Sequence, residues 1–209
     1  MADIKIQPKK TSPISYILYA VALLAIIFMI VKSLTDSKKP VETTAVVVDT
    51  SRVAGSVMEF VAFLNGTSGV GNKEDTERSP QYTSYGLHLL TAAIGATADR
   101  DAATDNNIIQ HRKRLQQMSD SIQNNWSPTE KSGRIKTAFV SAANLLNSIQ
   151  EKKYPELNDQ AAQLMQYAQA IVPQKRIMDQ KAEVKRYFDQ SKSILQAMVQ
   201  KSKSTEAKQ

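Results

Sequence analysis

Cysteine is absent from the 209 residues, and histidine, tryptophan, glycine and proline are scarce, with two, one, seven and seven copies. Without a thiol, the chain can have no disulfide framework, no cysteine-ligated metal or iron–sulfur site, no covalently attached haem and no thiol nucleophile. The low glycine and proline content excludes collagen-like and Pro/Gly-rich disordered chains. With 42% hydrophobic residues, the chain suits one ordinary domain and is too short for two.

One uncharged apolar run dominates the N-terminal region. It covers the eighteen residues from Ile14 to Val31, which as a helix would span about 27 Å. Continued to Leu34, the run fits a bilayer, and Ser12-Pro13 supplies a cap and a first-turn proline. A cleaved signal peptide is the alternative, but its apolar core would be shorter and a small-residue cleavage site would follow. We therefore predict a retained single transmembrane helix over 14–34, after a short basic tail over 1–13.

The charges that flank the apolar run do not decide its orientation. Three lysines precede the run and three follow it closely: Lys5, Lys9, Lys10, Lys32, Lys38 and Lys39. A short basic N-terminal tail more often stays in the cytoplasm while the following domain is exported. We expect a cytoplasmic N-terminus and an extracytoplasmic C-terminal domain, periplasmic in a bacterium, with the lipid bilayer as one partner.

The chain after a polar linker over 35–48 follows helical spacing. Apolar side chains recur three and four positions apart, and no alternating strand pattern of useful length competes with them. The expected buried stripes are Val53, Val57, Phe60, Val61 and Leu64; Tyr82, Tyr85, Leu89, Ala92, Ala93 and Ala96; Ile108, Leu115, Met118 and Ile122; Ile135, Phe139, Ala142, Leu146 and Ile149; Leu157, Ala161, Leu164, Ala168 and Ile171; and Ile177, Val184, Tyr187, Phe188, Ser191, Leu195 and Met198.

Proline-containing signals divide these stripes into arms. Ser79-Pro80 and the capping box Ser127-Pro128-Thr129-Glu130 mark helix starts, and Tyr154-Pro155 marks a kink or a break. We predict an all-α protein, in which the transmembrane helix is followed by an up-and-down bundle of about four helices over 49–200, or five or six if the arms are kinked.

Two of the arms would be long. Segments 80–125 and 128–172 would make the bundle elongated if each were one continuous helix, but the polar stretch 99–107 either kinks or divides the first. We expect a disordered tail over 201–209.

The sequence of the segment Gly66–Lys73 is close to the consensus motif of a phosphate-binding loop. Asn72 displaces Lys73 by one position, no hydroxyl residue follows, and three acidic residues come within the next four positions, where phosphates would lie. The same acids lack the alternating oxygen ligands and central glycine of a calcium loop. We interpret the segment as a surface loop.

The two histidines, His88 and His111, are too few for a His-rich zinc site and lie outside the Glu-x-x-His spacing of di-iron bundles. His111 falls between Ile108 and Leu115, where a pH-responsive seam is one interpretation and a partly exposed structural histidine is the favoured one. No serine has a paired local triad signature. We therefore predict no catalytic, cofactor-binding or metal-binding residues, no cofactor and no enzymatic activity.

Basic residues are concentrated toward the C-terminus. Gln174–Gln209 carries nine basic and four acidic residues, whereas Val41–Pro173 carries twelve and fourteen. The run His111-Arg112-Lys113-Arg114 would spread around a helix and form no flat phosphate-binding face. Anionic lipid or an acidic protein would suit the basic tail, and no nucleic acid is expected as a partner.

Two functional hypotheses remain. The first is a membrane-anchored, non-enzymatic interaction or scaffold subunit that presents a helical bundle to protein partners in a larger membrane assembly. The alternative is an extracytoplasmic ligand-sensing bundle that signals through a partner protein, which requires a pocket between helices near Tyr82, Tyr85 and His88. The sequence leaves open whether the chain forms a homo-oligomer.

Overall fold

The computed structural model describes residues 50–67, 80–124 and 132–206. These ranges hold six α-helices and two short 3-10 helices, without any strand, so the all-α prediction is confirmed for them. In chain order the elements are α2 (Thr50–Leu64), α4 (Pro80–Asp101), α5 (Asn106–Asn124), α6 (Ser132–Lys153), η1 (Pro155–Leu157), α7 (Asn158–Ala170), η2 (Ile177–Gln180) and α8 (Lys181–Glu206). All belong to one compact unit, Val48–Gln209.

The predicted transmembrane helix over 14–34 lies outside the described residues. So do the linker over 35–48 and the capping box at Ser127. Within the described ranges, no helix has the length and apolar character needed to cross a membrane.

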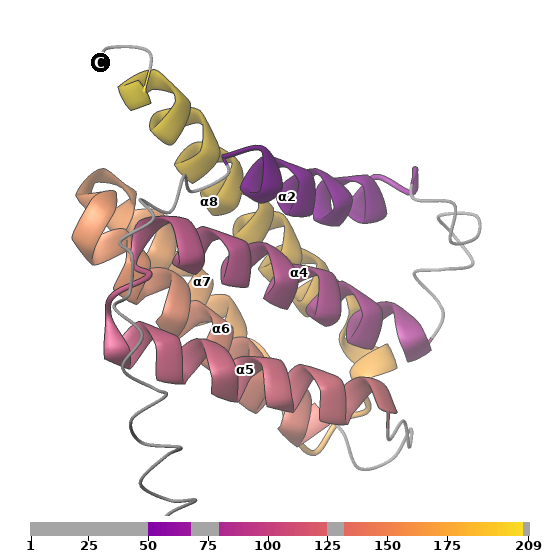
Figure 1. Cartoon of the computed structure of the whole chain (residues 1–209). Helices are drawn as coiled ribbons and strands as arrows, with labels where there is room; N and C mark the ends of the chain where they lie inside the picture. Colours follow the sequence, from indigo (N-terminus) through magenta and orange to yellow (C-terminus); the bar gives the residue numbers. More distant parts are fainter. Residues whose placement is uncertain (1–49, 68–79, 125–131, 207–209) are drawn as a thin grey trace, which may run out of the picture. The chain divides into compact units, whose positions relative to one another are not determined.

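Successive helices of this unit run in alternating directions and pack against their neighbours (Figure 1). Contacts link α2 to α4, α4 to α5, α5 to α6, α6 to α7 and α7 to α8, and α8 returns to contact α2. The helices therefore form a closed ring. Since α4 also contacts α6 and α8, it has neighbours on most of its sides.

Neither of the two long arms is continuous, so the condition for an elongated bundle is not met. The first arm is divided into α4 and α5, which pack side by side, and the second is divided in the same way into α6 and α7. At the first division, the Asp105 carboxylate accepts hydrogen bonds from the backbone N–H groups of Asn107 (2.9 Å) and Ile108 (3.1 Å). A carboxylate in this position caps the new helix start, and this cap separates the polar stretch into two helices.

The second division follows the proline signal. α6 ends at Lys153, and the next helical turn, η1, begins at Pro155, which is tolerated there because the first position of a helix needs no N–H donor. The predicted break at Tyr154-Pro155 is confirmed.

The C-terminal segment is more ordered than the sequence suggests. α8 continues to Glu206, so the predicted disorder of Lys201 onward is wrong up to that residue. Two contacts hold the last turns: Lys201 pairs with Glu156 at 2.6 Å, and the Ser202 hydroxyl accepts a hydrogen bond from Arg100 at 2.8 Å.

Aromatic rings from four helices meet at the centre of the core. Phe139 of α6 stacks on Tyr187 of α8, with ring centroids 4.0 Å apart, and the Tyr187 hydroxyl donates a hydrogen bond to the Phe139 carbonyl at 2.8 Å. Phe188 contacts Phe60 of α2 and Tyr82 of α4 edge to face. These contacts join the first and last described helices to the middle of the chain.

The predicted stripes are confirmed on the outer helices and are incomplete on α4. Ala92 was expected inside but is exposed, whereas Leu87, Leu90 and Ile94 are fully buried. The difference arises because a helix with neighbours on most sides has no single apolar stripe, so a one-face pattern misses part of its buried surface. Met118 and Val61 are half-buried at the edge of the core.

Two glycines give a matched test of this packing. A Cβ atom added to buried Gly86 of α4 would lie 2.8 Å from ring atoms of Phe188 and of Phe63, whereas one added to exposed Gly55 of α2 would meet nothing within 4 Å. We expect Gly86→Ala to lower the free energy of unfolding by about 1–2 kcal/mol, because overpacking outweighs the gain in helix propensity. Gly55→Ala should raise it by about 0.5–1 kcal/mol.

Urea denaturation followed by circular dichroism measures both changes. A Gly86→Ala protein as stable as Gly55→Ala would contradict the close approach of the two phenyl rings to α4.

Candidate functional site

An open groove lies over the exposed part of α4. Figure 1 shows α4 running between α2 and α5, both of which pack against it. The groove has a volume of about 570 Å³, and its floor includes the small residues Ala92, Gly95 and Ala96 of α4. Because small side chains let a helix backbone approach closely, the floor is suited to accept an added helix.

The charges that line this groove are mostly positive. Arg52 of α2 and Lys113 of α5 both line the groove, and neither makes an ion pair with another described residue. Arg112 of α5 forms an ion pair with Asp99 of α4, so the acidic side chain is already neutralised. The remaining cations favour an anionic occupant.

The basic run 111–114 diverges around α5, as its helical spacing predicts. Arg112 and Lys113 line the groove, whereas Arg114 lines a separate hollow of about 310 Å³ between α5 and α6. Arg134 shares that hollow and donates a hydrogen bond to the Ser121 hydroxyl at 2.6 Å.

A smaller pocket of about 240 Å³ lies where the start of α4 meets η2 and the start of α8. α4 contributes Tyr82 and Thr83, η2 contributes Ile177 and Met178, and Val184 of α8 adds a further apolar wall. The buried Thr83, Ile177 and Val184 form a lining that the core holds in place.

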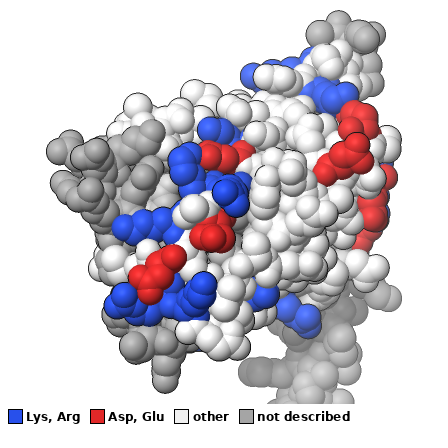
Figure 2. Space-filling view, turned by 180° about the vertical axis from the view of Figure 1, so that it is seen from behind, with Lys and Arg blue, Asp and Glu red and all other residues white. Residues whose placement is uncertain are grey.

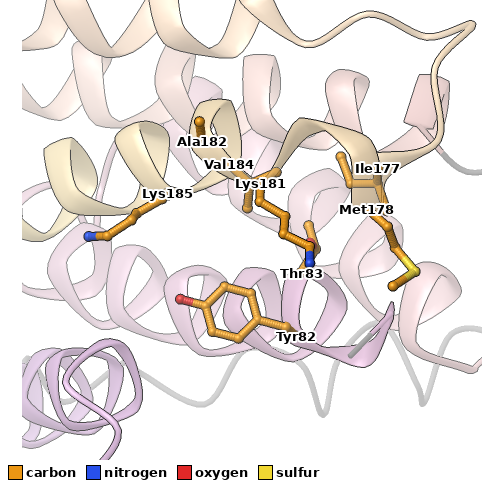
Figure 3. A pocket seen from close by; sticks show the side chains of 8 residues that line it. All are labelled: Tyr82, Thr83, Ile177, Met178, Lys181, Ala182, Val184 and Lys185. Atoms are coloured by element: carbon orange, nitrogen blue, oxygen red, sulfur yellow. The ribbon is translucent and has the colours of Figure 1, made fainter. Parts of the chain in front are cut away.

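Two lysines of α8 complete the lining of this pocket. Figure 3 shows Lys181 extending from α8 toward Tyr82 and Thr83, and Lys185 extending on the hydroxyl side of the Tyr82 ring. Lys185 pairs with Asp189 at 2.6 Å, and Lys181 makes no ion pair with a described residue. An apolar body and an anionic group are therefore the complementary ligand features.

The pocket only partly matches the predicted one. Tyr82 lines it, but Tyr85 packs against Phe63 with ring centroids 5.4 Å apart, and His88 lies outside the pocket. Three-residue steps in a helix fall short of a full turn by about 60° each, so His88 faces away from Tyr82 by about 120°. The two lysines were missed because they belong to a helix distant in sequence.

A buried polar cluster joins the C-terminal parts of α4 and α8 to Tyr154, which lies between α6 and η1. Arg100 binds Asp101 through two hydrogen bonds of 2.7 and 2.8 Å and donates a third to the Tyr154 hydroxyl at 2.8 Å. Tyr154 donates in turn to Asp101 at 2.9 Å, and Arg100 reaches Ser202. Because these groups satisfy one another and connect three segments of the chain, we interpret the cluster as structural.

Burial and the neighbouring charges shift the pKa values of this cluster. Burial raises the pKa of the Tyr154 hydroxyl above its ordinary value, and the negative charge of Asp101 raises it further. For Arg100, burial lowers the pKa, but hydrogen bonds and the charge of Asp101 outweigh burial and leave the pKa raised. Arg100 and Tyr154 thus keep their protons at neutral pH.

The histidines do not assemble a reactive centre. His88 is half-buried on α4, with its Nδ1 atom buried and without a hydrogen-bond partner, and His111 is exposed on α5. Among residues 50–67, 80–124 and 132–206, no cluster of three or more His, Asp or Glu side chains is arranged to bind a metal ion. Lys73 and the acidic residues after it lie outside these ranges.

Several basic side chains of the C-terminal segment lie next to acidic side chains in the folded chain. On the face drawn in Figure 2, Lys and Arg side chains lie beside Asp and Glu side chains, with wide uncharged areas between the groups. Arg176 pairs with Asp179 at 3.0 Å, and Lys185 and Lys192 both pair with Asp189. The ion pairs therefore offset part of the positive charge that the segment carries.

Comparisons with protein-family models, with curated proteins and with solved structures give no match to this chain.

The Tyr154 hydroxyl gives a test of the polar cluster. We expect Tyr154→Phe to lower the free energy of unfolding by about 1–3 kcal/mol, because Arg100 and Asp101 each lose a buried partner. Since the folded pKa of Tyr154 is raised, its contribution is complete below about pH 10 and is lost as the pH rises further. Above pH 10, Tyr154→Phe should therefore lose stability less steeply than wild type, by up to about 1.4 kcal/mol per pH unit.

Tyr167→Phe is the control, because the half-buried Tyr167 hydroxyl makes no hydrogen bond to a described residue. It should change stability by less than about 0.5 kcal/mol. Chemical denaturation between pH 7 and 11 would refute the structural role if both tyrosine variants behaved alike.

Proposed function

We propose that the chain is a membrane-anchored, non-enzymatic interaction subunit that docks an acidic helix of a protein partner in the groove over α4. The observation that carries this proposal is the combination of a small-residue floor with cations on both sides of the groove. Helix-in-groove recognition needs close backbone approach and complementary charge, and it needs no reactive side chain. The apolar segment 14–34 would hold the subunit at the membrane.

An acidic helix suits the groove better than a second copy of the described bundle. Arg52 and Lys113 have no ion-pair partner among the described residues, so an acidic side chain on either edge of a docked helix would gain an ion pair. In a symmetric dimer with groove facing groove, a second copy would bring the same cations to the same place, and like charges facing each other weaken association. Lys113 is also exposed, so its ammonium group is accessible to a partner.

The membrane topology can be tested in intact cells. Protease added outside should digest the bundle while leaving a cytoplasmic marker protein whole, because the short basic tail is expected to hold the N-terminus in the cytoplasm. Digestion only after the inner face is opened would reverse the orientation. A mature N-terminus that begins after Val31 would mean that the segment is a cleaved signal peptide.

Variants of the groove test the docking proposal. Ala92→Leu places a larger side chain on the exposed floor, and the double change Arg52→Glu with Lys113→Glu reverses the free cations. Cross-linking and co-purification of the full-length protein from its own membranes should recover one acidic partner with wild type. Each groove variant should reduce that recovery by about tenfold or more, with unchanged helical content.

Ala162→Leu on α7 and Lys153→Glu at the end of α6 are matched controls on exposed positions outside the groove. Both should retain the partner. Equal recovery with all five proteins would refute docking in this groove. A loss of function in His111→Ala, with assembly intact, would instead favour a chemical role.

A further inference from the structure

We propose that the pocket between α4, η2 and α8 binds a small organic carboxylate with an apolar body. This site is separate from the docking groove and does not depend on it. The two sites share α4, but the pocket uses Tyr82 and Thr83 at its start, whereas the groove uses residues 91–99.

The first argument is the division of the pocket into an apolar and a cationic part. Ile177, Val184 and the Tyr82 ring offer a surface for a hydrocarbon or aromatic group. Lys181 brings its ammonium group to the Thr83 side of the pocket, whereas Lys185 lines the pocket with its stem and extends in the opposite direction (Figure 3). A neutral apolar ligand would leave the Lys181 ammonium group unused, and a bare inorganic anion would leave the apolar wall uncovered.

The second argument is that the Lys181 ammonium group makes no ion pair with a described residue. The acidic side chain of η2, Asp179, feels the charge of Lys181 but forms its hydrogen bonds with Arg176, at 3.0 and 3.1 Å. Lys181 itself has no ion pair or hydrogen bond to a described residue, although its side chain lines a pocket. A carboxylate in the pocket would give it a charge-assisted hydrogen bond.

The third argument is the rigidity and the size of the site. Ile177 and Val184 are buried at 3% and 2% exposure, and the preceding turn is fixed by Gln180, whose side chain bonds to both the N–H and the carbonyl of Val172. The volume of about 240 Å³ is below the roughly 300–1,000 Å³ of pockets for drug-sized ligands. The ligand is therefore a small molecule rather than a lipid chain or a peptide.

The Thr83 hydroxyl supplies a further polar contact. It lines the pocket and makes no hydrogen bond to another described residue, so it is free to donate to the second carboxylate oxygen. Thr83 and Lys181 belong to different elements, and a ligand that bridges them would connect the start of α4 to the start of α8. A ligand that connects these two helices would be consistent with the ligand-sensing hypothesis.

Calorimetric titration of the full-length protein in detergent micelles tests the site, with empty micelles as the blank. The probes are phenylacetate, benzoate and isovalerate as carboxylates, phenylacetamide as the uncharged counterpart of phenylacetate, and acetate as the charge without the apolar body. At least one of the three carboxylates should bind saturably below about 10 mM. Phenylacetamide and acetate should each bind at least about tenfold more weakly than the best carboxylate.

Substitutions then locate the binding. The double change Lys181→Met with Lys185→Met keeps much of the side-chain length and removes both charges, and it should weaken binding by about tenfold or more. Thr83→Val should weaken it by a few fold, at unchanged melting temperature. Arg186→Met is the matched control, because Arg186 is an exposed cation of α8 that does not line the pocket.

Three results would overturn the proposal. They are the absence of saturable binding for all three carboxylates, equal binding of phenylacetate and phenylacetamide, and binding that survives the double lysine change. If Arg186→Met weakened binding as much as the double change, the attraction would be a general effect of a basic protein. None of these results bears on the groove variants, so the two proposals fail separately.

Discussion

The described bundle depends on the close burial of α4. This helix contacts α2, α5, α6 and α8, and a helix with that many neighbours must carry small residues where they approach closely. Gly86 is the clearest case, because Phe63 of α2 and Phe188 of α8 leave no room for a methyl group at this position. The aromatic core can therefore form only if α4 carries no side chain at Gly86. The contact of the two phenyl rings with the α4 backbone at this position joins α2, α4 and α8.

The same constraint explains where the two surfaces lie. α2 and α5 pack on either side of α4 and are held apart by it. A groove therefore remains between α2 and α5, over the small residues of α4. At its start, α4 meets η2 and the first turns of α8, where the chain has just turned back from α7. Irregular geometry at such a junction leaves space between well-packed elements, and the pocket occupies it.

The sequence predicted the elements better than their junctions. Helical periodicity identified the buried faces of α5, α6, α7 and α8, because each of these helices has one apolar stripe. On α4, which has no single stripe, it identified only part of the buried surface, and it did not decide whether 99–107 bends or divides the arm. That outcome depends on Asp105, whose capping role is one of several that an aspartate in a polar stretch can take. Residues that meet from distant segments, such as Arg100 and Tyr154 in the polar cluster or Tyr82 and Lys181 in the pocket lining, leave no local pattern.

The groove and the pocket are separable because α4 holds them apart along its length. The nearest lining residues on α4, Thr83 of the pocket and Thr91 of the groove, are eight residues apart, which corresponds to about 12 Å along the axis. Energetic effects at sites more than about 10 Å apart, without shared partners, are close to additive. Coupling between an occupied pocket and a docked helix would therefore require movement of α4 itself. Because Phe63 and Phe188 contact α4 at Gly86, between the two sites, such movement would disturb the aromatic core. The fold thus favours independent behaviour of the groove and the pocket.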